Sequence, residues 1–471
     1  MDKRTKIVAT ISDRTATPDF LKKLFAAGVN VVRLNSAHQE VAETKQVVDV
    51  VRAVDKSIAI LIDTKGPEIR TSSFGKALAV EAGDEVFIKG NPKGESGENV
   101  LYVNYDSFVQ DVPVNEYVLI DDGEIALRVV GKDAEQLRCI VENSGKIKNK
   151  KGVNVPNVKL HLPVISQKDE QFIRFAVENE IDFIAHSFVQ YADDVKAVRR
   201  ILQSYNSHTK IIAKIENQTG VDNIESIIKE ADGIMVARGD LGIEVPVEKI
   251  PIIQRKLVRD CIKNNKMVIV ATQMLHSMIS NPRPTRAEVN DVATAVYEKA
   301  DALMLSGETA NGEYPLQSVT MMYKIIKEVE NTLNKYPIKT QPLDTNILSV
   351  LSNSAVIACN TLKIKAIVVD TMSGRTARHL ASYRGKIPVY AFCYNEYAAR
   401  QLALSYGIQA YKINVSSSRD EFLRNTIEFL VRENKISLTD KVVVIGGSFG
   451  VTNGASFMEI STAQNLIEYE D

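Results

Sequence analysis

The stretch IDFIAHSFVQYADDVKAVRRILQSYNSHTKIIAKIEN, residues 181–217, contains the unit that much of the chain repeats. It begins with a short apolar run (181–188), continues with a segment of helical period (193–204) and ends with a second apolar run (210–217). Both runs have the length and the β-branched content expected of parallel strands that are buried on both faces. The stretch therefore predicts two parallel strands joined by a helix.

The same alternation extends outward in both directions. Further apolar runs of strand length occupy residues 6–11, 29–35, 58–64, 233–238, 266–273 and 300–306. Segments of helical period separate most of these runs, at 18–27, 39–54, 250–264 and 285–299. Eight strand signals with helical crossovers predict an α/β protein built on a closed (β/α)8 TIM barrel rather than on an open sheet.

The rhythm breaks between Thr71 and Pro156, where short alternating strands with Gly- and Asn-rich turns predict a small all-β domain inserted after the third barrel strand. After Pro337 the βα alternation restarts, with a helix near 347–361 and strands at 366–370, 387–392 and 442–447. We therefore expect three domains. They are a catalytic barrel (1–70 and 157–337), an inserted β lid (71–156) and a C-terminal α/β domain (338–471).

Composition excludes several classes of protein. The 58 Lys and Arg residues nearly balance the 59 Asp and Glu residues, so the net charge of −1 gives no reason to expect nucleic acid or an acidic membrane as a partner. The four cysteines form no CxxC pair, which predicts a reducing compartment without a disulfide framework or structural zinc. The first residues lack an apolar stretch long enough for a signal peptide, and no run approaches the about 20 apolar residues of a membrane span. We expect a cytoplasmic protein.

Polar residues close several of the predicted barrel strands, often as pairs two positions apart. Arg33 and Asn35 end the second strand, Lys214 and Glu216 end the fifth, and Arg238 and Asp240 follow the sixth; Asp63 and Thr64 end the third strand and Thr272 lies near the end of the seventh. Residues i and i+2 share a strand face, so each such pair should point the same way. A salt bridge at the rim would explain any single pair, but five strands that end in this way favour an active site, because these ends converge on one face of a barrel.

The residue types indicate the chemistry. Glu216 and Asp240 supply hard oxygen ligands, which suit Mg²⁺ or Mn²⁺. Lys214 places a compact positive charge beside them, and the Arg33 guanidinium can bind phosphate. Positive groups around a carboxylate-held metal predict phosphoryl transfer, because charge spreads over the transferring oxygens. The turn RGDLG (238–242) adds backbone N–H groups at the start of a possible helix, which would form an anion site.

Several longer strings resemble the pyruvate kinase family. They are RLN (33–35), DTKGPEIRT (63–71), KIENQTGV (214–221), MVARGDLGIEVP (235–246), ATQML (271–275), PTRAEVNDVATAV (284–296) and LMLSGETANGEYP (303–315). The resemblance covers essentially the whole chain, including KKGVNVP (150–156) in the predicted lid. It implies transfer of the phosphoryl group of phosphoenolpyruvate to ADP, giving pyruvate and ATP in the last step of glycolysis. It also implies a homotetramer that needs Mg²⁺ or Mn²⁺ together with K⁺.

The resemblance assigns roles to the residues that match the family's motifs. Lys214 would stabilise the transferring phosphoryl group and the enolate, and Glu216 and Asp240 would bind Mg²⁺. The residues implied to hold phosphoenolpyruvate are Arg33, Lys214, Gly239, Asp240 and Thr272, with Thr272 also in the protonation of the enolate. Those implied to face the nucleotide are Asn35, His38, Arg70 and Lys151, and those implied to contribute to the K⁺ site are Asn35, Asp63 and Thr64.

Some residues depart from the family pattern. Ala37 stands where the family carries a serine that ligands K⁺, which weakens the expected K⁺ site. Glu68 argues the other way, because potassium-dependent members carry glutamate at this position. We expect a K⁺ requirement that is weakened but real. The chain also departs from the family pattern at 12–13, 36–39 and His276. None of these departures replaces a main candidate for catalysis or metal binding, which are Arg33, Lys214, Glu216, Asp240 and Thr272.

The segment TMSGRTAR (371–378) resembles the family loop that can hold an effector phosphate. Its candidate donors are Thr371, Ser373, Arg375 and Thr376. A strand-to-helix turn capped by Ser or Thr is the alternative. The loop SFGVTNG (448–454), within the Gly-rich stretch IGGSFGVTNG that could also bind a phosphate, lacks basic residues. A sugar phosphate or nucleotide monophosphate effector, or none, therefore fits better than fructose bisphosphate.

Two rival functions stay open at this point. A metal-dependent aldolase or lyase would share Glu216, Asp240 and Arg33, but it would need neither ADP nor an inserted lid with the basic string KNKK (148–151). A non-catalytic relative that senses phosphoenolpyruvate or a sugar phosphate would tolerate the departures from the family pattern. Loss of Lys214 or Thr272 would favour this sensor, and both residues are present.

Overall fold

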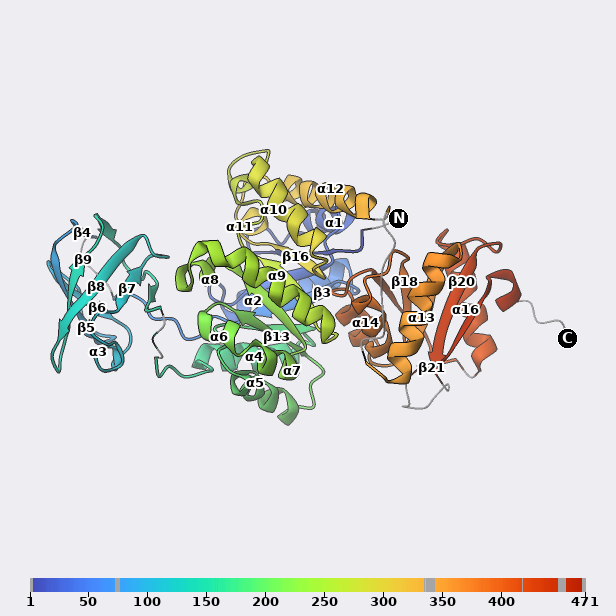
Figure 1. Cartoon of the computed structure of the whole chain (residues 1–471), viewed down its shortest axis with the longest axis horizontal. Helices are drawn as coiled ribbons and strands as arrows, with labels where there is room; N and C mark the ends of the chain where they lie inside the picture. Colours follow the sequence, from blue (N-terminus) through green and yellow to red (C-terminus); the bar gives the residue numbers. More distant parts are fainter. Residues whose placement is uncertain are drawn as a thin grey trace.

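The computed structural model describes residues 3–72, 77–156, 158, 160–333, 335, 344–416, 418–447 and 455–467. Three parts follow one another along the longest axis of the molecule (Figure 1). An all-β part lies at one end, a helix-covered barrel lies in the middle, and an α/β sheet lies at the other end. Within the described residues, no helix combines the length and the apolar character needed to cross a membrane.

Eight parallel strands form a closed barrel in the order β1-β16-β15-β14-β13-β12-β3-β2. The strands are β1 (Lys6–Thr10), β2 (Val31–Asn35), β3 (Ala59–Asp63), β12 (Phe183–His186), β13 (Lys210–Ile215), β14 (Gly233–Ala237), β15 (Met267–Ala271) and β16 (Ala302–Leu305). Each corresponds to one of the eight apolar runs, so the predicted (β/α)8 barrel is confirmed.

Helices surround the barrel. They are α1 (Pro18–Ala26), α2 (Val41–Val54), α4 (Gln167–Glu178), α5 (Ala192–Ser204), α6 (Gln218–Asp222), α7 (Ile224–Glu230), α8 (Arg238–Glu244), α9 (Ile250–Lys263), α10 (Arg286–Tyr297), α11 (Gly307–Ala310) and α12 (Pro315–Leu333). Local signals begin several of them: Ser166 caps α4, and Thr285 forms a capping box with Glu288 at the start of α10.

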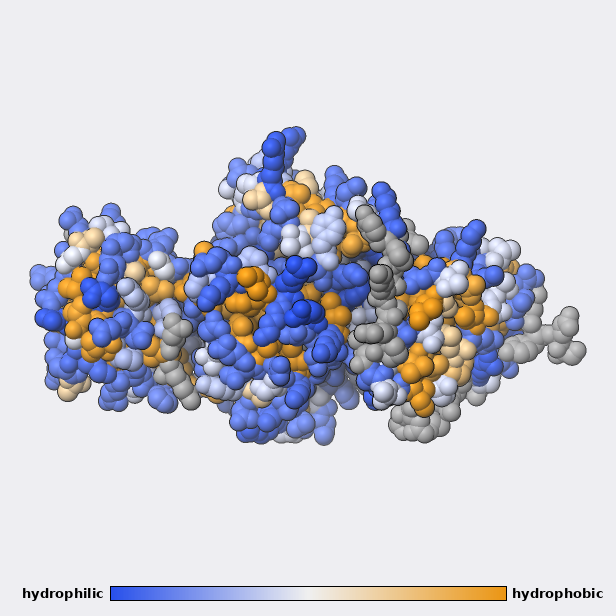
Figure 2. All heavy atoms as spheres, viewed as in Figure 1, coloured by the Kyte–Doolittle hydropathy of each residue, from blue (hydrophilic) through white to orange (hydrophobic). Residues whose placement is uncertain are grey.

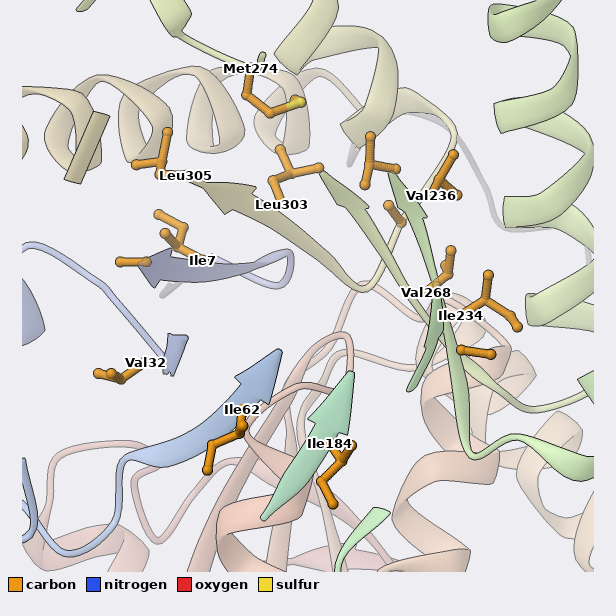
Figure 3. Close-up of a cluster of buried hydrophobic side chains, with 14 of the residues drawn as sticks. Ile7, Val32, Ile62, Ile184, Ile234, Val236, Val268, Met274, Leu303 and Leu305 are labelled. Carbon is orange, nitrogen blue, oxygen red and sulfur yellow. The ribbon is translucent and has the colours of Figure 1, made fainter. Parts of the chain in front are cut away.

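The two faces of the barrel strands pack into two different hydrophobic cores. Outward side chains such as Ile7, Ile62 and Ile234 belong to the large cluster between the barrel and its helices (Figure 3). The alternate residues, among them Val8 and Ile212, fill the barrel interior. This alternation follows from the two-residue period of a strand, and it determines which polar residues at the strand ends point inward.

The segment between β3 and α4 forms β-structure with its own core. A six-stranded sheet, in the order β11-β7-β8-β9-β5-β6, lies beside a pair of strands, β10 and β4. The elements are β4 (Leu78–Val80), β5 (Glu85–Gly90), β6 (Val100–Val103), α3 (Phe108–Asp111), β7 (Tyr117–Ile120), β8 (Ile125–Lys132), β9 (Leu137–Val141), β10 (Gly145–Ile147) and β11 (Val153–Asn154). The predicted all-β character of this insertion is confirmed.

The C-terminal part is a five-stranded sheet in the order β19-β18-β17-β20-β21. Its elements are α13 (Ile347–Thr361), β17 (Ile364–Thr371), α14 (Arg375–Ser382), β18 (Val389–Cys393), α15 (Glu396–Leu402), β19 (Ile408–Lys412), α16 (Arg419–Arg432), β20 (Lys441–Gly447) and β21 (Ala455–Thr462). The sequence predicts β17, β18 and β20 but misses the two edge strands, β19 and β21. The predicted boundary at 337/338 and the loop residues 448–454 lie outside the described residues.

Candidate active site

Three charged side chains point into the barrel at the carboxyl ends of its strands. Arg33, Asp63 and Lys214 each lie two residues after an apolar residue that fills the barrel interior. Those residues are Val31, Leu61 and Ile212. Because side chains alternate along a strand, the three charged residues continue the same inward rows. Their exposed fractions are 8%, 1% and 9%, so three charges are buried together where the barrel opens.

These charges form one network. The Arg33 guanidinium donates to Asp63 Oδ2 at 2.8 Å through Nε and lies 2.6 Å from it through Nη2. The Lys214 ammonium lies 3.0 Å from Asp63 Oδ1 and 2.9 Å from Glu216 Oε1. Burial alone would raise the pKa of Asp63, but attraction to Lys214 and Arg33 outweighs it and lowers the pKa. Burial likewise opposes the charge on Lys214, but Asp63, Glu216 and Asp240 raise its pKa above the ordinary value. Lys214 is therefore a firmly protonated cation.

Ser187 is a member of this network that the sequence analysis missed. Its hydroxyl accepts a hydrogen bond from the Lys214 ammonium at 2.7 Å and donates to the Thr64 carbonyl at 2.6 Å. Strand parity could have found it, because Phe183 and Ala185 point into the barrel and Ser187 continues that row. Gly66 passes close by with φ +72°, and a Cβ there would lie 2.9 Å from the Ser187 Cβ. Only glycine leaves room for this approach.

Glu216 lies where the barrel network meets a cleft. Its Oε2 accepts the Phe188 N–H at 2.5 Å, and Phe188 adopts a left-handed φ of +56° at the turn that presents this N–H. Burial raises the pKa of Glu216, Lys214 lowers it and the charge of Asp240 raises it again, with a net rise to about 7. Glu216 is buried and Asp240 is half-buried, and a bound cation would stabilise two neighbouring carboxylates that repel each other.

Asp240 and Arg238 do not share a face, so the prediction that this pair points the same way is wrong. The helix α8 begins at Arg238, and residues two apart on a helix point in different directions. Asp240 lines the cleft with Glu216. Arg238 reaches Asp291 on α10 at 2.5 Å and the Thr272 carbonyl at 2.7 Å. Arg238 therefore fixes the backbone of the site rather than facing the cleft.

Thr272 and Gly239 lie against each other. The Gly239 N–H donates to Thr272 Oγ1 at 2.7 Å, and that hydroxyl donates to the Ala271 carbonyl at 2.6 Å. Thr272 has φ +67° and Gln273 has φ +53°, a left-handed conformation that is strained for a β-branched residue. The surrounding structure must stabilise such a strained conformation, and residues strained in this way are typical of functional sites.

A cleft of about 320 Å³ lies between the barrel mouth and the inserted β-structure. Residues from the barrel side, including Glu216 and Asp240, line it together with Arg70 and Lys151. Lys151 pairs with Asp121 at 2.8 Å, and Arg70 pairs with Glu68 at 2.7 Å. Of the predicted nucleotide residues, Arg70 and Lys151 therefore meet in one cleft. The other two, Asn35 and His38, are not part of its lining, and His38 is exposed.

The predicted K⁺ residues are neighbours. Asn35 is the register partner of Asp63 in the β2–β3 ladder, and Thr64 follows Asp63 directly. The Asn35 side-chain oxygen accepts the N–H of Ala37 at 3.1 Å. These residues offer amide, carboxylate and hydroxyl oxygens, which suit a hard cation. The Ala37 side chain adds no oxygen.

In the part of the chain that the structure describes, no group of three or more His, Cys, Asp and Glu residues is arranged to hold a metal ion. Mg²⁺ is usually bound by one or two carboxylates plus substrate oxygens and water. Glu216 and Asp240 match that donor set. They do not match the closed set of protein ligands typical of structural zinc.

The predicted effector turn is partly used by the fold itself. Thr371 Oγ1 accepts the Gly374 N–H at 2.9 Å, and Gly374 has φ +76° just before α14. Ser373 and Arg375 are exposed, whereas Thr371 and Thr376 are buried. Thr371 therefore stabilises a strand-to-helix turn, as the structural alternative requires.

Comparison with known proteins gives one result across the chain. Residues 2–319 match the family model "Pyruvate kinase, barrel domain", and residues 349–461 match "Pyruvate kinase, alpha/beta domain". The chain is 46% identical to a pyruvate kinase of Borreliella burgdorferi, with 99% of each sequence covered, and 40% identical to one of Staphylococcus aureus, with 97% of this chain and 80% of the relative covered. A crystal structure of a pyruvate kinase from Cryptosporidium parvum superposes with a TM-score of 0.91 at 33% identity, and covers 98% of this chain and 96% of that one.

Proposed function

This chain belongs to the pyruvate kinase family, and from that premise we propose how its own side chains carry out the reaction. The enzyme is a phosphotransferase, and its family's reaction moves the phosphoryl group of phosphoenolpyruvate to ADP, giving pyruvate and ATP. The family match disfavours the rival aldolase or lyase, which would have no use for ADP. The sensor differs from the kinase only in lacking turnover, and the experiment below separates the two.

Lys214 is the central group of the proposal. Its ammonium lies between Asp63 and Glu216 and is connected to Arg33 through Asp63, and this single arrangement carries the proposal most strongly. A fixed positive charge in a buried site stabilises charge that develops on transferring phosphoryl oxygens. The same charge would stabilise the enolate that remains once the phosphoryl group has left. Arg33 would hold the phosphate of phosphoenolpyruvate.

Glu216 and Asp240 would hold Mg²⁺ or Mn²⁺, as the family's usual need for a divalent metal suggests. When bound, the ion would supply positive charge to the phosphoryl oxygens and to the substrate carboxylate. The raised pKa of Glu216 and its repulsion from Asp240 support this assignment, because a cation would relieve both. Gly239 and Thr272 would orient the substrate, with the Thr272 hydroxyl in the protonation of the enolate.

The nucleotide would enter from the side of the inserted β-structure. Arg70 and Lys151 line the cleft and are paired there with Glu68 and Asp121. The diphosphate of ADP would compete for these two cations, because both are partly exposed and can exchange partners. Asn35 and His38 would contact ADP only after the lid moves, since neither lies in the cleft lining.

A K⁺ site at Asn35, Asp63 and Thr64 would lack one hydroxyl ligand, because Ala37 stands where the family carries a serine. We expect a K⁺ requirement that is weakened but real, since the other oxygens are close to one another. Initial rates measured at increasing KCl, with a tetraalkylammonium salt to hold ionic strength constant, check this expectation. Full activity without any monovalent cation would refute it.

The family's homotetramer is also proposed for this chain. Three residues of α13, Ile347, Val350 and Ile357, have exposed fractions of 67%, 47% and 45%. Figure 2 shows apolar residues along the visible face of this helix. Exposed apolar surface of this kind favours contact with another protein chain. An effector phosphate at Thr371, Ser373, Arg375 and Thr376 is proposed as well; of these residues, Ser373 and Arg375 are exposed.

The first experiment measures pyruvate formation from phosphoenolpyruvate and ADP with Mg²⁺, with and without K⁺, for the wild type and Lys214→Met. Removal of the charge should lower kcat by about 100-fold or more. Lys210→Met is the matched control, because Lys210 lies at the other end of β13 and pairs with Asp232. Its kcat should stay near that of the wild type. A folded wild type that binds phosphoenolpyruvate but forms no pyruvate would establish the sensor instead.

A further inference from the structure

Asp169 is a fully buried carboxylate in the first turn of α4, and its two oxygens have different partners. Oδ2 accepts the Ser166 N–H at 3.1 Å and the Ser166 hydroxyl at 2.6 Å, as part of the capping box of α4. Oδ1 accepts the N–H groups of Lys65 and Gly66, in the loop after β3, at 2.9 and 3.2 Å. Capping of the helix therefore explains one oxygen, and the other binds the loop.

The loop after β3 connects this carboxylate to Lys214. The Lys65 N–H belongs to the same planar peptide as the Thr64 carbonyl, and the two groups of a trans peptide point in opposite directions. The Thr64 carbonyl accepts the Ser187 hydroxyl at 2.6 Å, and this hydroxyl accepts a hydrogen bond from the Lys214 ammonium at 2.7 Å. A continuous chain of hydrogen bonds therefore leads from Asp169, through one peptide and one hydroxyl, to Lys214.

The bond to Gly66 extends the same support to the carboxylate side of the site. Gly66 packs tightly against Phe188, because a Cβ at Gly66 would lie only 2.5 Å from Phe188 Cδ2. The Phe188 N–H in turn donates to Glu216. A shift of the loop would therefore move the turn that binds Glu216 as well as the hydroxyl that binds Lys214.

Hydrogen bonds compensate the charge of Asp169. The four bonds come from N–H groups and a hydroxyl, and a buried carboxylate is costly without such partners. Burial lowers the pKa of the neighbouring His186 to about 4, although Asp169 attracts a proton to it, so His186 brings no positive charge at neutral pH. The donors of the loop are therefore bound to an ionised acceptor, which holds them more strongly than a neutral one.

We propose that Asp169 is a positioning residue for phosphoryl transfer. It fixes the peptide between Thr64 and Lys65, so that Ser187 holds the Lys214 ammonium in place. Successive hydrogen bonds in a buried chain strengthen one another, so the effect reaches Lys214 although Asp169 does not touch it. The inference rests on the role proposed for Lys214 in the kinase reaction.

The first test compares Asp169→Ala with Ser166→Ala. Asp169→Ala removes both bonds to the loop and should lower kcat and kcat/KM for phosphoenolpyruvate by about tenfold each, because stabilisation of the transition state is lost. Ser166→Ala is the matched control, since it removes the hydroxyl of the helix cap and leaves Asp169 Oδ1 in place. It should lower the melting temperature and keep kcat near the wild-type value. Equal kcat in the two variants would make Asp169 a helix cap alone and overturn the proposal.

A double-mutant cycle with Ser187→Ala tests the route. If the loop acts through Ser187, Asp169→Ala should slow the Ser187→Ala enzyme little further, and the double variant should be about tenfold slower than the wild type. Independent effects would multiply to about 100-fold and overturn this route. Asp169→Asn keeps a neutral acceptor for the loop and should lower kcat about fivefold, which gives a second measurement if the alanine variant does not fold. An unchanged kcat in Asp169→Asn would also overturn the proposal.

Hydrogen exchange followed by mass spectrometry measures positioning without turnover. In the full-length protein, exchange within residues 64–70 should be faster in Asp169→Ala than in the wild type, and unchanged in Ser166→Ala. Unchanged exchange in Asp169→Ala would overturn the positioning role. A wild type that forms no pyruvate would instead refute the kinase function, so the two failures are distinguishable.

Discussion

Lys214 shows how one residue acquires its role from strand register. The sequence places it two residues after Ile212, and the inward direction of Ile212 in the barrel decides that the ammonium meets Asp63 and Glu216. A lysine one position earlier or later would point toward the surrounding helices. The strong pairing keeps Lys214 protonated, so its contribution is a fixed charge rather than a proton that is gained and lost.

Ser187 offers a test of how Lys214 is positioned. Ser187→Ala removes the hydroxyl that accepts from the ammonium at 2.7 Å, and should lower kcat about tenfold, the cost of one hydrogen bond to a charged group. The KM for ADP should change little, because Ser187 does not line the nucleotide cleft. Steady-state kinetics checks both values. Ser187→Thr keeps the hydroxyl and should retain more activity than Ser187→Ala; the reverse order would contradict the positioning role.

At the scale of elements, the turn after β14 decides which residues face the substrate. The i,i+2 spacing of Arg238 and Asp240 predicts a shared face only if the chain stays extended at 238–240, whereas the turn RGDLG (238–242) also predicts the start of a possible helix. A helix that begins at Arg238 sends the two side chains apart. Asp240 then faces the cleft, and Arg238 ties α8 to α10 and to the strained turn at Thr272.

Arg238→Lys tests this second role. Lysine keeps the charge but loses the planar fork that reaches Asp291 and the Thr272 carbonyl together. We expect kcat/KM to fall at least about tenfold and the free energy of unfolding to fall by about 2 kcal/mol. Arg255→Lys on α9 is the control, because Arg255 is exposed, and it should change neither quantity. An intact kcat/KM in Arg238→Lys would show that the turn at Thr272 keeps its conformation without the fork.

At the scale of the whole molecule, the C-terminal part covers the end of the barrel where the strands begin, opposite the catalytic residues. Leu404 is fully buried in the cluster that fills the barrel interior, although it lies between α15 and β19. Arg384 donates to both Asp301 oxygens at 2.9 and 2.7 Å, and Asp301 directly precedes β16. Arg400 and Asp182 form a similar buried pair at 2.7 Å. The C-terminal part therefore contributes to barrel stability as well as carrying its own sheet.

Arg384→Ala should lower the free energy of unfolding by about 3 to 5 kcal/mol, because it leaves the Asp301 carboxylate buried without its cation. Arg432→Ala, which removes an exposed arginine, should change it by less than about 0.5 kcal/mol. Urea unfolding followed by circular dichroism measures both, since the chain has no tryptophan. Asp301→Asn in the Arg384→Ala background should recover part of the loss. No recovery would show that the destabilisation has another cause.

The sequence by itself determined the barrel, because strands buried on both faces must be continuously apolar and leave an unmistakable pattern. It also marked the polar residues that end those strands and the family to which the chain belongs. The edge strands β19 and β21 escaped prediction, because an edge strand is half exposed and its sequence mixes polar and apolar residues.

Only the tertiary structure decided which polar residues meet. Sequence separation hides the contacts of Lys214 with Ser187 and Asp63, which lie 27 and 151 positions away along the chain. The contacts of Arg238 with Asp291 and with the Thr272 carbonyl were hidden in the same way. The physical reason is that direction and proximity depend on backbone register and on how whole elements pack, whereas a local pattern reports only which residues prefer to be buried.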